Sequence, residues 1–246
     1  MPVIYSSSSG TKDDGVIYKS NQSSWVNARD ATSGTVSLNN QNHQSLTAAA
    51  RGPSRSGGIV YSIYRSFFVF DTSGITGTVA SAELSIRGWS TNDGSVIAVK
   101  SNAFGGDGGT ALASGDFDAI AGWSAGSSLA GSATVYGSQI LAGSWNTSGY
   151  NDFTATSDLL TDMKNQNVVI ICLMDYTNDY LNSALTSNAY LNCGGYLAEY
   201  GGTTRDPHID YTLATGYAND FNGVASANIG KVMGVATANI EKVNGI

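Results

Sequence analysis

Few side chains in this sequence are suited to acid–base catalysis. The two histidines, His43 and His208, lie in a run of Asn and Gln and beside a proline. Asp116 and Asp118 alternate with Phe117, so on a strand both carboxylates would share one face, as a glycosidase acid–base pair requires. Such pairs are more often solvated turn residues, and no Gly-x-Ser-x-Gly nucleophile turn is present. We therefore predict that the protein is not an enzyme.

Metal chemistry has equally little support in the sequence. Cys172 and Cys193 have no second Cys or His at ligand spacing, so we expect two free, buried thiols and no cofactor. Oxygen ligands that suit calcium occur in three segments: Asp13-Asp14-Gly15, Asn92-Asp93-Gly94 and residues 175–179. None has EF-hand spacing, and Asp-Gly and Asn-Gly pairs also mark ordinary turns. A structural calcium ion is kept as an alternative.

Tryptophans are the third group with binding chemistry, because an indole ring can stack on a sugar. The sequence has four, Trp25, Trp89, Trp123 and Trp145. A tryptophan in a small sandwich is more often core or half-buried than a binding platform. Glycan binding through Trp89, Trp123 and Trp145 is therefore a rival hypothesis and not the leading one.

The elements that position these side chains are predicted to be strands joined by turns. Residues 80–87 alternate apolar and polar side chains, which indicates a strand with one buried face. Residues 168–174 are apolar throughout, which indicates a central strand covered on both faces. Further strands are predicted over residues 58–71, 95–101, 135–141 and 206–211. Short strands at this spacing predict an all-β sandwich.

Two local expectations accompany these strands. In the strand over residues 58–71, Phe68 and Phe70 should point into the core and Arg65 should pair with an acidic neighbour. One short helix is predicted over residues 157–164, with Ser157 as its cap.

Composition excludes several classes of partner. The net charge of −7 disfavours nucleic acid and anionic membranes, because both are polyanions. No stretch approaches the roughly 18 apolar residues that a membrane span needs. Residues 1–5 lack the basic and apolar character of a secretory signal. We expect a protein made in a cytosol, without membrane insertion.

The most specific signal is an 11-residue repeat. Residues 222–232 and 233–243 match at eight of eleven positions, and residues 244–246 begin a third copy. A helix would place Val224, Ile229, Val232 and Val235 on one face, but a glycine in every copy weakens a helix. Short strands broken by turns fit equally well, and we favour a mixed, non-continuous conformation.

Either conformation leaves an apolar stripe that must be covered by another surface. We expect that surface to belong to another chain, with the protein's own sandwich as the alternative. The predicted partner-binding residues are Val224, Ile229, Val232, Val235, Ile240, Val243 and Ile246.

Several segments occur in an order that is typical of one group of proteins. An Asp-Gly pair at 14–15 and a Trp at 25 precede an Arg-aromatic-Phe-Asp strand at 64–71, a Ser-Ala-x-Leu strand at 80–86 and a Pro-x-hydrophobic-x-Tyr strand at 207–211. This series resembles the jelly-roll modules found both as carbohydrate-binding-like domains and as structural domains of tailed-phage virion proteins. The repeats are similar to Asn-Gly-Val-Ala-x-Ala-Asn-Ile-x-Lys-Val repeats in phage structural proteins. The resemblance implies fold and role, and no binding residue.

The sequence thus predicts an all-β jelly-roll β-sandwich over residues 1–213 and an apolar repeat tail over residues 214–246 for docking or oligomerisation. The expected function is that of a bacteriophage virion structural protein, a capsid decoration or fibre-like component. Its partners would be other virion proteins or copies of itself. The alternative is a glycan-binding module or receptor-binding adhesin that recognises a host-surface glycan.

Overall fold

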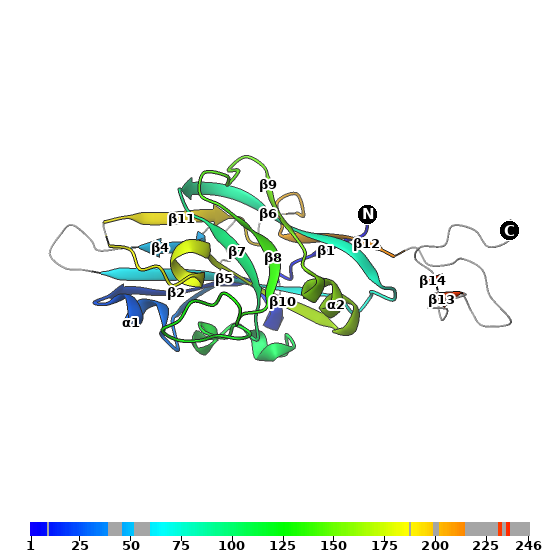
Figure 1. Ribbon diagram of the computed structural model, residues 1–246, viewed down its shortest axis with the longest axis horizontal. Helices are drawn as coiled ribbons and strands as arrows, with labels where there is room; N and C mark the ends of the chain where they lie inside the picture. The colour runs from blue at the N-terminus through cyan, green and yellow to red at the C-terminus, as the bar shows by residue number, and fades with distance from the viewer. Residues whose placement is uncertain are drawn as a thin grey trace.

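The computed structural model describes residues 1–8, 10–38, 46–51, 60–186, 188–198, 202–214, 231–232 and 235–236; the segments 46–51, 231–232 and 235–236 are described by their backbone only. The strands up to residue 213 form two antiparallel sheets, A and B, which confirms the predicted all-β sandwich (Figure 1). A jelly-roll order of these strands stays a prediction.

Sheet A combines strands from distant parts of the sequence. In spatial order they are β1 (Val3–Tyr5), β12 (His208–Leu213), β6 (Val79–Asn92) and β9 (Tyr150–Thr154). The side chains of β6 alternate as predicted: Leu84 and Ile86 are fully buried between the sheets, whereas Glu83 and Trp89 are exposed on the opposite side. Sheet A therefore has one inner face and one outer face.

Sheet B is larger and is organised around β5 (Tyr61–Asp71). Its other strands are β3 (Thr35–Leu38), β2 (Gly15–Gln22), β10 (Val168–Asp175), β7 (Val96–Lys100) and β8 (Val135–Ile140). One edge of β5 pairs with β2, and the other edge pairs with β4 (Leu46–Arg51) over residues 62–65 and with β10 over residues 66–71. Because β4 continues through β11 (Tyr190–Gly195) to β6, the two sheets join at this fork.

Short helices and single helical turns connect the strands. They are η1 (Gly10–Lys12), α1 (Trp25–Arg29), η2 (Phe104–Gly106), η3 (Ser114–Asp116), α2 (Ser157–Asn165) and η4 (Tyr176–Tyr180). Helix α2 confirms the helix predicted over residues 157–164. Its cap is Thr156 and not Ser157, because the Thr156 hydroxyl accepts the Leu159 N–H and Ser157 is already helical. Within the described ranges, no helix is long and apolar enough to cross a membrane.

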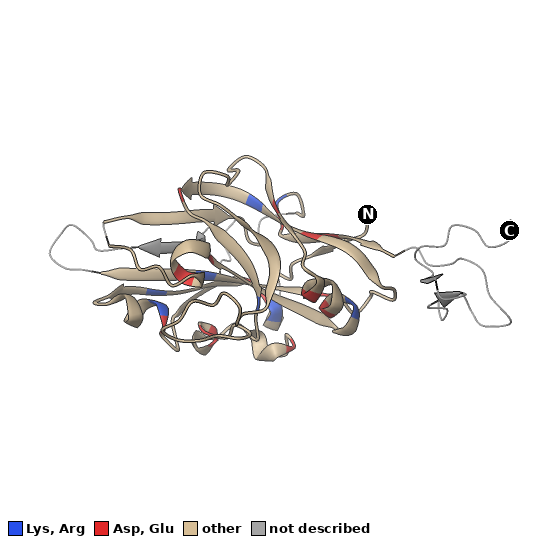
Figure 2. Ribbon diagram, viewed as in Figure 1, with Lys and Arg blue, Asp and Glu red and all other residues tan. Residues whose placement is uncertain are grey.

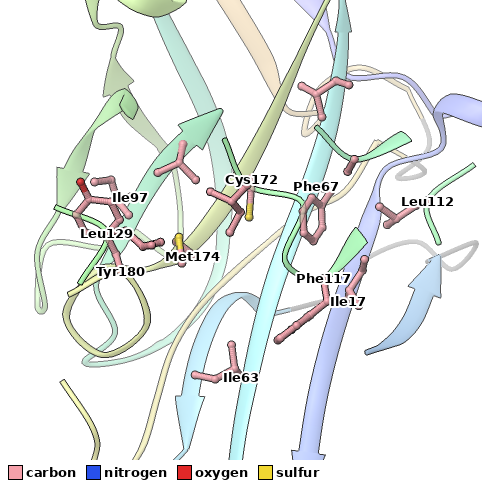
Figure 3. Close-up of a cluster of buried hydrophobic side chains, with 14 of the residues drawn as sticks. Ile17, Ile63, Phe67, Ile97, Leu112, Phe117, Leu129, Cys172, Met174 and Tyr180 are labelled. Carbon is pink, nitrogen blue, oxygen red and sulfur yellow. The ribbon is translucent and has the colours of Figure 1, made fainter. Parts of the chain in front are cut away.

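Apolar side chains form two cores, one on each face of sheet B. The first core lies between the sheets and contains Phe68 and Phe70, as predicted. The second lies on the far face of sheet B, beneath residues 101–134 and α1 (Figure 3). Strand β10 contributes to both, with Ile171 in the first core and Cys172 in the second. The prediction of a central strand covered on both faces is confirmed.

The second core also contains a buried ionic group centred on Arg65. Arg65 is fully buried, and its Nε and Nη2 donate to the two carboxylate oxygens of Asp179, each at 2.7 Å. Its Nη1 donates to the Phe117 carbonyl at 2.7 Å, and Nη2 also donates to the Arg29 carbonyl at 3.0 Å. The guanidinium lies 4.2 Å from the centre of the Phe117 ring and 4.4 Å from that of Trp123. The sequence predicted an acidic partner for Arg65, and in the structure that partner is Asp179.

The repeat region contains a small ladder of its own. Strand β13 (Lys231–Val232) pairs antiparallel with β14 (Val235–Ala236), with Val232 opposite Val235. This pairing agrees with short strands and not with a helix at these four residues. The other predicted partner-binding residues, Val224, Ile229, Ile240, Val243 and Ile246, lie outside the described residues.

Candidate functional site: the outer face of sheet A

The four tryptophans differ sharply in their accessibility. Trp145 is buried in the first core, where its Nε1 donates to the Gly194 carbonyl at 3.0 Å, and Trp25 is buried in the second. Trp123 is half-buried, with its ring packed on two buried arginines. Trp89 is 48% exposed. The expectation of glycan contact is therefore corrected for Trp145, which is buried, whereas for the half-buried Trp123 it stays a prediction.

The candidate acid pair lies in a turn segment and not on a strand. Asp116 ends the turn η3, and its Oδ2 accepts from the backbone N–H groups of Ala113 at 2.9 Å and Phe104 at 3.3 Å. No strand passes through Asp116 and Asp118 in this described segment, so the two carboxylates do not share a strand face. The Asp116 carboxylate therefore stabilises the loop through hydrogen bonds to its backbone. His43 lies outside the described residues.

The two thiols lie in different cores. Cys172 belongs to the second core and Cys193 to the first, and both are free and buried, as expected. Burial raises the pKa of the Cys193 thiol to about 12, which keeps it protonated and unreactive at neutral pH.

In two of the segments considered for calcium, an aspartate accepts hydrogen bonds from nearby protein groups. Asp175 caps η4, where its Oδ1 accepts the Asn178 N–H at 2.6 Å, and Asp14 accepts the Ser6 hydroxyl at 3.0 Å. In the part of the chain that the structure describes, no three His, Cys, Asp or Glu side chains gather to hold a metal ion.

The outer face of sheet A gathers aromatic and polar side chains from strands far apart in sequence. We define it by Tyr5 on β1, His208 and Asp210 on β12, Glu83, Arg87 and Trp89 on β6, and Tyr150 and Asp152 on β9, together with Tyr196, Arg205 and Asp206 from the segment between β11 and β12. Figure 2 shows that Lys, Arg, Asp and Glu are sparse in the part of the chain that the structure describes.

One end of the outer face is built around Trp89. The Tyr196 ring lies 5.8 Å from the Trp89 ring at 77°, an edge-to-face contact. Tyr196 is buried, its hydroxyl accepts a hydrogen bond from Arg205 Nη1 at 2.9 Å, and the Arg205 guanidinium lies 4.9 Å from its ring centre. Trp89 is thus supported from one side while nearly half of its surface faces solvent.

The centre of the face is built around Tyr150 and His208. Their rings lie 4.7 Å apart at 80°, and Tyr5 packs on the other side of His208 at 5.7 Å. The Tyr150 hydroxyl donates to the Thr204 carbonyl at 3.0 Å, and the Arg87 guanidinium lies 5.9 Å from the Tyr150 ring centre. Arg87 and Tyr150 are also cross-strand partners, which fixes their register.

The opposite end of the face is acidic. Glu83 pairs across the sheet with Asp210, and Asp152 on β9 lies opposite Ser85, two residues along β6 from Glu83. Partial burial, followed by repulsion from Asp152 and Asp210, raises the pKa of the Glu83 carboxyl. His208 Nε2 lies 3.3 Å from Asp210 Oδ2.

Two polar atoms of the outer face are buried without a hydrogen-bond partner in the described part of the chain. They are Asp206 Oδ1, an acceptor, and Arg87 Nε, a donor. Asp206 is only 7% exposed, and burial raises the pKa of its carboxyl to about 6 although His208 opposes the shift. Buried groups of this kind are rare in proteins and call for a partner. Because both atoms are buried, neither is accessible at the surface of the outer face.

Most of this face was not identified from the sequence. The alternation of residues 80–87 predicts that Glu83 and Arg87 share a side, and continuing it by two residues adds Trp89. Tyr5, Tyr150 and Asp206 carry no local signal, because only strand pairing across the sheet brings them together.

Fold and site together define an all-β sandwich protein with one aromatic, polar sheet face. Neither a scan against protein-family models nor a search of curated proteins gave a match to the chain. The resemblance to phage jelly-roll modules therefore stays a prediction.

Proposed function

We propose that this chain is a structural protein of a bacteriophage virion, held in the particle by its C-terminal repeats. The sandwich is then a rigid, non-catalytic body, and residues 214–246 supply the attachment. The partners are other virion proteins or further copies of this chain. The role as a capsid decoration or a fibre-like component rests on the resemblance of the repeats to those of phage structural proteins.

One structural observation carries this proposal. The last strand of the two sheets ends at Leu213, and the strands described after it, β13 and β14, pair with each other and with neither sheet. The backbone of this part of the repeats thus has local structure that does not extend the sandwich.

The energetics favour attachment through a repeated apolar segment. Burying one Val or Ile side chain contributes about 1.5–3 kcal/mol, so one repeat copy, which has three such residues, offers a contact of useful strength. A second copy of the repeat, or several chains around a symmetric site, raises overall affinity through effective concentration.

A graft tests whether the repeats are sufficient. Residues 214–246 are fused to a monomeric fluorescent protein and produced in cells in which the phage assembles. We expect purified particles to carry the fusion. The matched control carries Val232→Asp and Val235→Asp, which place charges at paired positions of the β13–β14 ladder and should abolish incorporation. Particles free of the unmodified fusion, or equally labelled by both fusions, would count against the proposal.

A further inference from the structure

One peptide bond at the entry to β12 joins an aspartate to a proline. Asp206 and Pro207 form the only Asp-Pro pair in the sequence, and both residues are buried. The proline nitrogen carries no hydrogen and leaves as a secondary amine, which takes up a proton readily. The aspartate side chain can reach its own main-chain carbonyl carbon by closing a five-membered ring. This backbone bond therefore has a nucleophile and a good leaving group on its two sides.

The Asp206 carboxyl group is in a state that suits attack on this carbonyl. Asp206 is 7% exposed, and its Oδ1 has no hydrogen-bond partner in the described part of the chain, so no hydrogen bond must break before this oxygen reacts. Burial, partly offset by His208, raises the pKa of the carboxyl to about 6. At mildly acidic pH the group therefore carries the proton that the leaving nitrogen needs.

The carbonyl group of the same bond faces the imidazole of His208. His208 Nδ1 lies 3.0 Å from the Asp206 carbonyl oxygen, and because a carbonyl oxygen only accepts, Nδ1 is the donor. His208 Nε2 lies 3.3 Å from Asp210 Oδ2. The imidazole also lies between two rings, with centres 5.7 Å away for Tyr5 and 4.7 Å away for Tyr150. A fixed donor on a carbonyl oxygen stabilises the negative charge that develops there during attack.

The titratable and charged groups around the bond come from all four strands of sheet A and from the residue before Asp206. They are Tyr5 on β1, Arg87 on β6, Tyr150 on β9, His208 and Asp210 on β12, and Arg205. Of these, His208 lowers the pKa of Asp206, so the protonation of this carboxyl depends on the charge of the imidazole. None of them donates a hydrogen bond to Asp206 Oδ1.

We propose that the bond between Asp206 and Pro207 cleaves itself once per molecule. An oxygen of the Asp206 carboxyl group attacks the Asp206 carbonyl carbon and forms the new C–O bond of a cyclic anhydride, while His208 Nδ1 donates to the carbonyl oxygen. The C–N bond to Pro207 breaks, and the nitrogen keeps the electron pair and takes the carboxyl proton. Water then hydrolyses the anhydride to two carboxyl groups. The attack is intramolecular, so no translational entropy is lost.

Cleavage leaves the repeats connected to the sandwich without a covalent bond. The C-terminal product, residues 207–246, contains β12, which stays paired with β1 and β6 and keeps Ile209 in the first core. The sandwich and the repeats then separate only when β12 leaves sheet A. This activity goes beyond the role in attachment, because its reacting groups belong to the sandwich and require no partner.

The test follows the purified full chain by intact-mass spectrometry during incubation at about pH 5 and at about pH 8. We expect the products 1–206 and 207–246 at the lower pH and slower cleavage at the higher pH, where the Asp206 carboxyl is ionised. The folded chain should cleave about 100-fold faster than the same chain unfolded in urea, because only the fold holds His208 on the carbonyl oxygen. Equal rates would indicate ordinary acid hydrolysis of an Asp-Pro bond and would overturn the proposal.

Variants separate the roles of the three residues. Asp206→Asn and Pro207→Ala should each slow cleavage at least about 100-fold, because one removes the acidic nucleophile and the other the tertiary amide. His208→Gln should slow it about 100-fold, because Gln offers a donor near the place of Nε2 but none at Nδ1. Asp152→Asn is the matched control, since it removes an exposed carboxylate of the same face, and it should cleave as the unmodified chain does.

Thermal melts establish that each variant folds, and hydroxylamine in the incubation traps the anhydride. The product 1–206 should then carry a hydroxamate in place of one carboxyl group of its last residue. The proposal is overturned if the folded chain does not cleave, if the His208 variant cleaves as the Asp152 control does, or if the product carries only free carboxyl groups in excess hydroxylamine.

Discussion

Replacing Arg65 by Met should be among the most damaging single changes in the sandwich. The change removes four hydrogen bonds that Arg65 donates, two of them to Asp179, and it leaves the Asp179 carboxylate fully buried. Arg29 also forms a buried ion pair with Asp179, with its Nε 3.5 Å from Oδ1, but that Nε donates its hydrogen bond to the Asp179 backbone carbonyl at 2.7 Å, so it does not replace the two hydrogen bonds from Arg65. A buried carboxylate that has lost both of these donors is the costly product of this substitution.

The expected loss follows from the burial of the pair. Breaking a fully buried ion pair by removing one partner costs about 3–5 kcal/mol. Total unfolding free energies are about 5–15 kcal/mol, so the variant should lose about a fifth or more of its stability. Removing both charges, as in Arg65→Met with Asp179→Leu, should recover part of that loss, because no isolated charge then stays buried.

Urea unfolding followed by tryptophan fluorescence and circular dichroism measures these free energies. Arg87→Met is the matched control, because it removes an arginine that stacks near one ring and forms no ion pair in the described part of the chain. We expect it to cost within about 1 kcal/mol. If Arg65→Met costs no more than Arg87→Met, the structural role assigned to the buried pair is wrong.

Two further outcomes follow from buried polar groups. Burial raises the pKa of Asp175 to about 6, so the folded protein binds its proton more tightly than the unfolded chain; stability from this group is present below about pH 4 and is lost as the pH rises through 6. The unfolding free energy of the Asp175→Asn variant, compared with that of the unmodified chain, should therefore rise by about 3 kcal/mol as the pH increases from 4 to 8. Urea unfolding at each pH measures this difference, and a difference that does not change with pH would contradict the prediction. Trp145→Phe leaves a buried carbonyl without its donor and should cost about 1–3 kcal/mol in the same assay, whereas Trp89→Phe should stay within about 0.5 kcal/mol; equal costs would refute the assigned burial.

Strands with a clear local period were predictable from the sequence. Alternating side chains in residues 80–87 predict a strand buried on one face, and β6 has this pattern. The apolar run over residues 168–174 predicts a strand buried on both faces, and β10 is buried throughout. The cover over the second core was not predicted. Residues 101–134 have no strand or helix period, yet Phe104, Phe117 and Leu129 from this segment are fully buried. Their burial depends on long-range packing, which a local pattern does not encode.

The fork in β5 illustrates the same limit. Residues 58–71 read as one strand, but their partners change from β4 to β10 near Arg65, and that change joins the two sheets. The sequence did predict an acidic partner for Arg65. It could not identify Asp179, because 114 residues separate the two in the chain.

For the candidate site, the sequence indicated only that tryptophan side chains could bind a ligand. Three tryptophans, Trp89, Trp123 and Trp145, were candidates by sequence, and the structure exposes Trp89 most. Its neighbours Tyr196, Arg87 and Asp206 gain meaning only from their positions on the folded sheet, since they come from three different segments.

The central claim is attachment through the repeats, and the copy number of the chain per particle tests it most directly. Phage carrying the chain as residues 1–213 would be compared with phage carrying residues 1–246, using quantitative mass spectrometry of purified particles normalised to the major capsid protein. Circular dichroism of the purified shorter chain would establish that its sandwich is folded. We predict that the folded, shorter chain falls to background in the particles. An equal copy number for the two chains would contradict the account.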